Sequence, residues 1–227
     1  MALAVEKEEV VCFGRRLLAA GLTTGTGGNL SILNPRDGLV AISPSGIEYG
    51  VMTAEDVPVT DLLGTVVEGK RKPSSELDFH LALYHKRPDI RAVVHTHSVY
   101  ATTMACLNWE IPAVHYLVAF SGFKVPLAPY ATFGTPELAR NIAESIGAYN
   151  AVLLANHGLV AVGESLSAAF AVAEEIELVA RIYYQAKCIG EPVVLPEEEM
   201  ARVMRKFRSY GRQGDKTVVD KPEESGC

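Results

Sequence analysis

The chain has 227 residues, of which 48% are hydrophobic and 21% are charged, a composition typical of a soluble globular domain with a large core. Its 27 acidic residues against 21 basic ones give a formal charge of −6 at pH 7. This charge argues against a nucleic-acid-binding surface, which needs clustered basic side chains. No apolar run approaches the ~18 residues that a membrane span needs, and the N-terminal segment has no signal-peptide core. We therefore expect a cytoplasmic protein that binds neither nucleic acid nor a membrane.

Two polar loops interrupt the predicted elements near the N-terminus. Apolar residues at helical spacing predict a helix over 5–20. A Gly/Thr-rich loop over 23–29 then opens onto a predicted hairpin over 30–42, which ends in Ser43-Pro44-Ser45-Gly46. Both loops expose backbone N–H groups that can bind a phosphate. Neither is a Walker or dinucleotide fingerprint, so each loop taken alone is more often a plain turn.

A helix with two serines at its start is the next candidate site. Ser75 with Asp78 resembles a capping box, and the helix is expected to end near Lys86. Because free N–H groups and the dipole attract anions to a helix N-terminus, Ser74 and Ser75 could hold a phosphate as well as cap the helix. Glu76 lies in the first turn, where a carboxylate stabilises the helix dipole. On the residues alone, that structural role is the preferred interpretation of Glu76.

A Val-rich run leads directly into His95-Thr96-His97 and predicts a buried strand that ends in two histidines. Side chains alternate along a strand, so these histidines share a face and can bind one metal ion, although a plain hydrogen-bonded pair fits equally well. His157 stands beside Gly158 between two apolar runs, where a strand meets a tight turn. Three such ligands suit a catalytic zinc ion, which keeps a further position open. The other histidines fall in helical or loop patterns and are weaker candidates: His80, His85 and His115.

The remaining elements follow from turn residues, helix caps and apolar spacing. They are short strands over 57–60 and 64–67, a helix over 99–107, extended segments over 111–116 and 123–130, a helix capped by Thr135, two strands around His157, a long helix capped by Ser165 that ends near 189, and a final helix over 196–209. We expect one domain over 1–212. The charged, nearly apolar-free segment over 213–227 predicts a disordered tail.

With these segments in order, the sequence resembles the class II aldolase/epimerase family of zinc enzymes that act on sugar phosphates. The resemblance covers nearly the whole chain, up to Tyr210-Gly211. It implies an α/β fold, a three-layer α/β/α sandwich around a mainly antiparallel central sheet, and a homotetramer with active sites at subunit interfaces. The motifs that carry it are Gly28-Asn29-Leu30-Ser31, Ser43-Pro44-Ser45-Gly46, Ser74-Ser75-Glu76, His95-Thr96-His97, the segments 111–116 and 129–135, and Asn156-His157-Gly158.

The resemblance also implies a role for each site residue. One zinc ion per subunit would be held by His95, His97 and His157. Glu76 would fill the fourth metal position in the absence of substrate and act as the base in its presence. Tyr116 would reach across the interface to the aldehyde oxygen, and Tyr210 would help to close the site. The substrate phosphate would be held by Gly28, Asn29, Ser45, Gly46, Ser74 and Ser75.

The activity implied is reversible cleavage of a ketose 1-phosphate into dihydroxyacetone phosphate and a short aldehyde. No lysine stands out as a Schiff-base former, and zinc would serve as the Lewis acid. A ribulose-5-phosphate 4-epimerase branch is the nearest alternative, but it typically has Asp at the position of Glu76 and lacks the 111–116 segment. A methylthioribulose-1-phosphate dehydratase also mismatches around Tyr116. A non-catalytic, adducin-like module loses the zinc histidines, which are present here.

Overall fold

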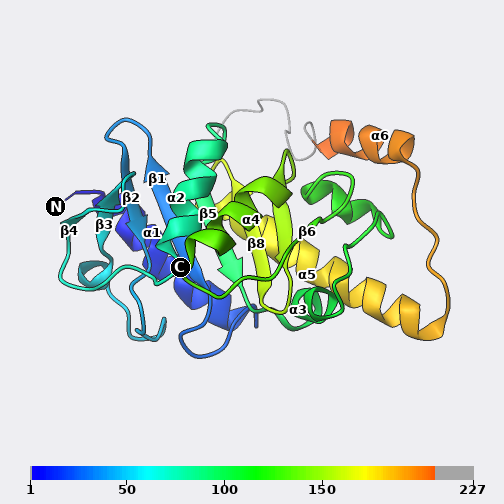
Figure 1. Ribbon diagram of the computed structural model, residues 1–227, viewed down its shortest axis with the longest axis horizontal. Helices are drawn as coiled ribbons and strands as arrows, with labels where there is room; N and C mark the ends of the chain where they lie inside the picture. Colours follow the sequence, from blue (N-terminus) through cyan, green and yellow to red (C-terminus); the bar gives the residue numbers. More distant parts are fainter. Residues whose placement is uncertain (1, 208–227) are drawn as a thin grey trace, which may run out of the picture.

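The computed structural model describes residues 2–207, which fold around one eight-stranded sheet (Figure 1). The strand order is β4-β3-β2-β1-β5-β8-β7-β6. Neighbouring strands are antiparallel, except that β6 and β7 are parallel. The strands are β1 (Asn29–Asn34), β2 (Leu39–Ile42), β3 (Val59–Asp61), β4 (Val66–Glu68), β5 (Ala92–Thr96), β6 (Leu127–Ala128), β7 (Ala151–Leu154) and β8 (Gly158–Gly163).

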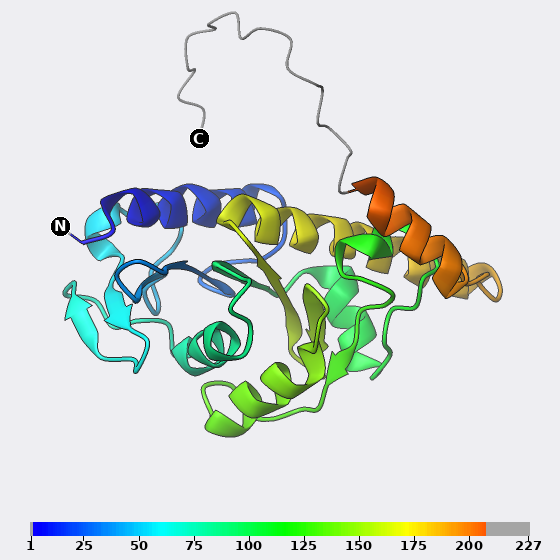
Figure 2. The ribbon, with the colours of Figure 1, turned by 90° about the horizontal axis from the view of Figure 1, so that it is seen from above.

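Two helical layers cover the sheet, and Figure 2 shows them on opposite faces. One layer contains α1 and the long helix α5, and the other contains α2 and α4. This arrangement confirms the predicted three-layer sandwich with a mainly antiparallel sheet. The helices are α1 (Ala4–Ala19), α2 (Leu77–Lys86), α3 (Val99–Cys106), α4 (Pro136–Ile146), α5 (Leu166–Ile189) and α6 (Glu197–Phe207), with the short 3₁₀ helices η1 (Ala54–Asp56) and η2 (Tyr116–Phe120).

Alternate residues of the central strands pack into two separate hydrophobic cores. Ala92 and Val94 of β5 lie in the core with α1 and α5, whereas Val93 lies in the core with α2 and α4. Because the sheet is buried on both faces, its central strands have nearly continuous apolar sequences. His95 has the parity of Val93 and therefore faces α2. There the Phe79 ring lies edge-on to the His95 ring, with 5.6 Å between the centroids.

The predicted helix caps were right at two helices and wrong at α2. The Thr135 and Ser165 hydroxyls accept backbone hydrogen bonds at the starts of α4 and α5. At α2 no side chain caps the helix, and the predicted capping box of Ser75 with Asp78 is absent. The Ser74 hydroxyl accepts instead from the Glu76 N–H at 3.2 Å. This local bond turns the chain before the helix begins and leaves the first N–H groups of α2 without a side-chain partner.

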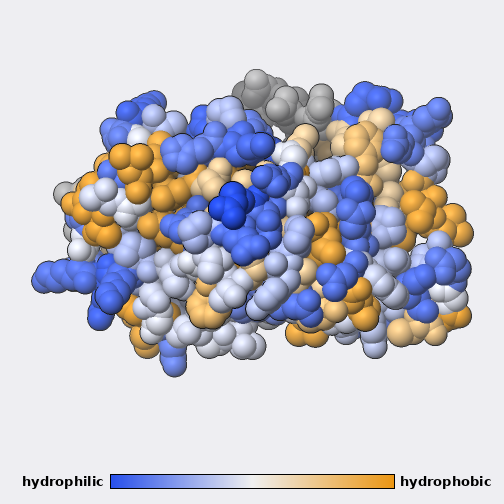
Figure 3. All heavy atoms as spheres, in the orientation of Figure 1, coloured by the Kyte–Doolittle hydropathy of each residue, from blue (hydrophilic) through white to orange (hydrophobic). Residues whose placement is uncertain are grey.

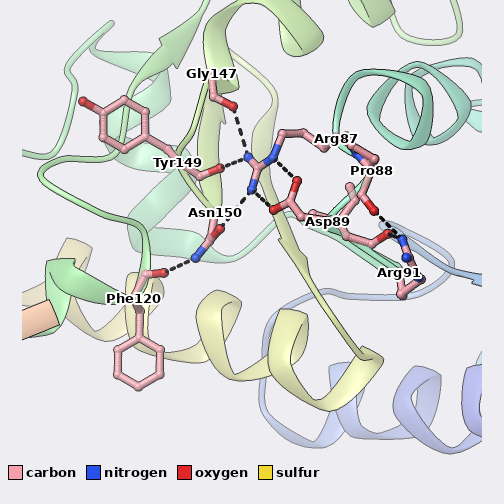
Figure 4. Close-up of polar contacts among 9 residues, drawn as sticks. Arg87, Pro88, Asp89, Arg91, Phe120, Gly147, Tyr149 and Asn150 are labelled. Atoms are coloured by element: carbon pink, nitrogen blue, oxygen red, sulfur yellow. Dashed lines mark hydrogen bonds and ion pairs between the residues drawn. The ribbon is translucent and has the colours of Figure 1, made fainter. Parts of the chain in front are cut away.

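Arg87, at the C-terminal end of α2, ties this helix to the segment before β7 (Figure 4). Its guanidinium donates to the carbonyl oxygens of Gly147 at 3.0 Å and Tyr149 at 2.8 Å. The same group forms a two-pronged ion pair with Asp89. These contacts join the C-terminal end of α2 to the segment that enters β7, the strand whose other end leads into the turn that carries His157.

Within residues 2–207, none of the helices is long and apolar enough to cross a bilayer. The final predicted helix is present as α6. The expected tail over 213–227 and the predicted site residue Tyr210 lie outside the described residues. The boundary of the domain at 212, the disorder of the tail and the cytoplasmic location therefore stay predictions.

Candidate active site

Three histidines converge at one end of neighbouring strands. His95 is on β5, His97 follows that strand directly, and His157 lies in the turn between β7 and β8. The ligand nitrogens of all three histidines lie within 4.8 Å of one another, and the Nε2 atoms of His95 and His97 are 3.0 Å apart. Pairing of β5 with β8, in which Thr96 is opposite Leu159, brings the turn to His97. The predicted cluster is therefore present.

The protonation of the histidines suits a metal ion. The Nδ1 of His95 lies 2.9 Å from the Leu159 carbonyl oxygen, which can only accept, so Nδ1 carries the proton and Nε2 presents a lone pair. A histidine held by a backbone carbonyl in this way is typical of metal ligands. Burial is the main cause that lowers the pKa of His95, His97 and His157, so the neutral rings are favoured.

Glu76 completes this cluster from the start of α2. Its side chain is buried, with Oε2 3.4 Å from His95 Nε2 and Oε1 3.5 Å from His157 Nε2. Oε2 accepts a hydrogen bond from the Asn29 amide at 2.9 Å, but Oε1 has no hydrogen-bond partner among residues 2–207. Burial raises the pKa of Glu76, and the nearby His157 opposes this shift. A buried carboxylate oxygen facing three imidazoles fits a bound cation, which would offset its desolvation.

A cavity of about 400 Å³ lies beside this cluster and has a polar wall. The wall is built where the loop after β2 meets the segment before α2, with Ser74 N–H donating to the Ser43 carbonyl oxygen at 3.0 Å. All six residues predicted to bind the substrate phosphate line it: Gly28, Asn29, Ser45, Gly46, Ser74 and Ser75. The structure thus brings the predicted phosphate-binding residues together next to the histidines.

Two glycines allow the backbones around this site to approach closely. Gly28 has φ +68°, and a Cβ there would lie 2.5 Å from the His95 carbonyl oxygen. A Cβ on Gly158 would lie 2.3 Å from the Thr96 carbonyl oxygen. Both distances are shorter than a carbon–oxygen contact allows, so larger residues would push the loop or β8 away from the histidines.

Tyr116 is not part of this cavity. It begins η2 and is 47% exposed, and its ring lies 6.1 Å from the Phe207 ring. Tyr116 does not line the cavity that residues 2–207 form. Within one chain the structure therefore does not bring Tyr116 to the histidines. Its predicted role needs a neighbouring subunit.

Glu177 supports the site but was not predicted from the sequence. Its carboxylate, on α5, accepts the backbone N–H groups of Tyr100 and Ala101 at 2.8 Å each. These groups belong to the first turn of α3, which starts directly after His97 and Ser98, and the Ser98 side chain does not cap it. A carboxylate at a helix N-terminus stabilises that turn. No local signal could identify Glu177, because it is far from α3 in the sequence.

Known proteins are similar to this chain in sequence and in structure. Residues 8–184 match the family described as the class II aldolase and adducin N-terminal domain. A 5-deoxy-D-ribulose 1-phosphate aldolase of Bacillus thuringiensis is 57% identical over 94% of this chain and 100% of its own. An L-fuculose phosphate aldolase of Escherichia coli K12 is 45% identical over 84% of this chain and 88% of its own. A solved L-fuculose 1-phosphate aldolase matches 92% of this chain and 98% of its own, with a TM-score of 0.90 and 48% identity.

Proposed function

The chain belongs to the class II aldolase and adducin family and is a ketose 1-phosphate aldolase, and we propose that it uses zinc to release dihydroxyacetone phosphate and a short aldehyde. The observation that carries this proposal is the cluster of three histidines with Glu76 beside the polar cavity. An adducin-like binding module would need no such cluster. The same cavity can hold the phosphate, because the polar loop residues and the segment before α2 line it and the N-terminal end of a helix favours an anion.

His95, His97 and His157 are the residues that would hold the metal. A divalent ion there would act as a Lewis acid toward the carbonyl and adjacent hydroxyl oxygens of the substrate. The tautomer of His95 is set by the Leu159 carbonyl, so its Nε2 lone pair points into the cluster without rearrangement. Zinc suits three imidazoles with an open position, which is why we favour it.

Glu76 is placed to move the proton at carbon. Aldol cleavage leaves negative charge on the carbon next to the carbonyl, and that carbon must then be protonated. Glu76 is the only carboxylate of residues 2–207 that lines the cavity, and burial raises its pKa, which makes it a stronger proton acceptor than an exposed carboxylate. The phosphate contacts fix one end of the substrate, and this fixed end aligns the reacting carbons with Glu76.

We favour a 5-deoxypentulose 1-phosphate as the substrate and L-fuculose 1-phosphate as the second choice. The relative that acts on 5-deoxy-D-ribulose 1-phosphate matches at 57% identity, against 45% for the fuculose phosphate aldolase. Cleavage between C3 and C4 would give acetaldehyde from the first sugar and lactaldehyde from the second. The dihydroxyacetone phosphate half is common to both, so the phosphate cavity does not distinguish them.

A screen of ketose 1-phosphates should show dihydroxyacetone phosphate release, fastest with the 5-deoxypentulose 1-phosphate. Coupled reduction of dihydroxyacetone phosphate measures the rate, and identification of the aldehyde fixes the cleaved bond. The unphosphorylated ketose serves as the control, and it should be a poor substrate because the polar wall has no anion to bind. Epimerised or dehydrated product without any aldehyde would contradict the proposal in favour of the alternative activities.

We also propose a homotetramer in which Tyr116 serves the site of a neighbouring subunit. Tyr116 is half-exposed and outside its own cavity. Large apolar side chains are exposed at the last residue of α5 and beyond it, with Ile189 90% exposed and Val193 84% exposed. Figure 3 shows hydrophobic residues gathered toward both ends of the molecule. Exposed apolar surface of this kind is typical of regions that another chain covers.

Tyr116→Phe should lose aldol cleavage but keep proton exchange at dihydroxyacetone phosphate. The phenol acts only on the aldehyde oxygen in this proposal, and the exchange reaction needs no aldehyde. Cleavage and exchange rates are measured on the same preparation, and sedimentation at assay concentration gives the assembly size. Equal losses in the two reactions would contradict the role of Tyr116. A fully active monomer would contradict the shared site.

A further inference from the structure

A chain of buried hydrogen bonds runs behind Glu76, away from the cavity. The Asn29 amide nitrogen donates to Glu76 Oε2 at 2.9 Å, and Asn29 Oδ1 lies 2.5 Å from Nε2 of His80. The other ring nitrogen of His80 lies 2.7 Å from the Ser31 hydroxyl, which lies 2.7 Å from the Tyr84 hydroxyl. These residues come from β1 and α2 and are all buried.

These hydrogen bonds have one consistent order of donors and acceptors, which is fixed by Glu76. A carboxylate only accepts, so the Asn29 nitrogen must face it and the Asn29 oxygen must face His80. The amide oxygen also only accepts, so His80 must carry its proton on Nε2. Burial lowers the pKa of His80 to about 3, so the ring is neutral and its Nδ1 accepts from Ser31. Ser31 in turn accepts from Tyr84, whose pKa is raised by burial.

An asparagine amide can rotate by half a turn with little change in shape. In the rotated state Asn29 would present its oxygen to Glu76 Oε2, and two acceptors would face each other 2.9 Å apart. Glu76 therefore disfavours the rotated state, and a donor on the opposite side of the amide disfavours it further and fixes the position of the amide. His80 Nε2–H is that donor.

We propose that His80 is a positioning residue that locks the Asn29 amide and thereby holds the Glu76 carboxylate toward the histidine cluster. The proposal rests on the proposed function of Glu76. His80 does not line the cavity among the described residues and has no contact with substrate to make. Its effect passes through Asn29. The second hydrogen of the Asn29 nitrogen stays available to the phosphate, so one amide can serve both the phosphate and Glu76.

A pair of substitutions separates this role from simple packing. His80→Gln places an amide donor near the position of Nε2 and can still bond Asn29 Oδ1. His80→Asn is shorter, so its amide reaches the position of Nδ1 near Ser31 and leaves Asn29 Oδ1 without its donor. Both variants bury one polar amide in place of the imidazole. We expect similar losses of thermal stability and similar metal content in the two.

The rates should differ sharply between these variants. We expect kcat for cleavage, and proton exchange at dihydroxyacetone phosphate, to fall ~10–100-fold in His80→Asn, the usual effect of losing a residue that orients an active-site group. The His80→Gln variant should stay close to the wild type in both reactions. His85→Gln, an exposed histidine on the same helix, is the matched control and should change neither. Equal rates in the Gln and Asn variants would overturn the proposal.

A second measurement does not depend on activity. Nitrogen-15 NMR of histidine-labelled, metal-loaded wild type should show His80 as the neutral Nε2–H tautomer, and His85→Gln should leave this state unchanged. The Nδ1–H tautomer would contradict the assignment of His80 Nε2 as the donor to Asn29 Oδ1. If the wild type neither cleaves a ketose 1-phosphate nor exchanges the proton, the proposed function fails. The tautomer result still decides whether His80 donates to Asn29.

Discussion

Replacing His157 with Ala should remove the metal and abolish cleavage while the protein stays folded. His157 supplies one of three converging nitrogens, and two imidazoles hold a metal far less tightly than three. We expect the loss of metal affinity to exceed the ~10–100-fold that follows changes to outer residues of a metal site. The fold should persist because His157 lies in a turn, whereas both strands beside it are held by the cores on either face of the sheet.

The measurements for this variant are metal content, cleavage rate and thermal unfolding on one preparation. His85→Ala removes an exposed histidine and is the control, with full metal content and rate expected. Chelation of the wild type should give the same loss as His157→Ala, and added zinc should restore only the wild type. A preparation with full activity and no stoichiometric divalent metal would refute the histidine site. Global unfolding on metal removal would show that the ion serves folding as well.

The residues of this cluster could be predicted because strand geometry is local. The period of two along β5 places His95 and His97 on one face, and the structure bears this out. The turn at His157 was indicated by Gly158 between two apolar runs. Their meeting follows from the pairing of β5 with β8, which the sequence pattern alone did not determine and the family resemblance implied.

What could not be predicted depends on contacts between distant segments. His80 looked like an ordinary helix residue, because its partners Asn29 and Ser31 are on β1. Glu177 caps α3 from another helix. The capping box at Ser75 was expected from local spacing, but the Ser74 hydroxyl binds the Glu76 N–H instead. Tyr116 needs a partner chain and Tyr210 lies outside the described residues, so the roles of both stay predictions.

Glu76→Gln should lower turnover by ~10²–10⁴, the usual contribution of a general base. Gln keeps the size of the side chain and an oxygen that can accept from Asn29, but it cannot take the proton from carbon. The three histidines are unchanged, so metal content should be largely retained. If Glu76 only stabilised the first turn of α2, the change would cost a few tenths to ~1 kcal/mol of stability and leave turnover intact. The structure favours the first outcome, because the Glu76 side chain makes no cap hydrogen bond and faces the histidines.

The exchange of the carbon-bound proton of dihydroxyacetone phosphate with solvent decides between these roles of Glu76. This half-reaction needs the base at carbon but no aldehyde, so Glu76→Gln should lose exchange and cleavage together. Asp78→Asn is the matched control, since Asp78 is a carboxylate in the first turn of α2 that does not line the cavity. Asp78→Asn removes a charge that interacts with the helix dipole but takes no part in the proposed chemistry. Both rates should therefore stay near those of the wild type. Exchange at the wild-type rate in Glu76→Gln would mean that another group moves the proton, and that Glu76 acts only on the helix.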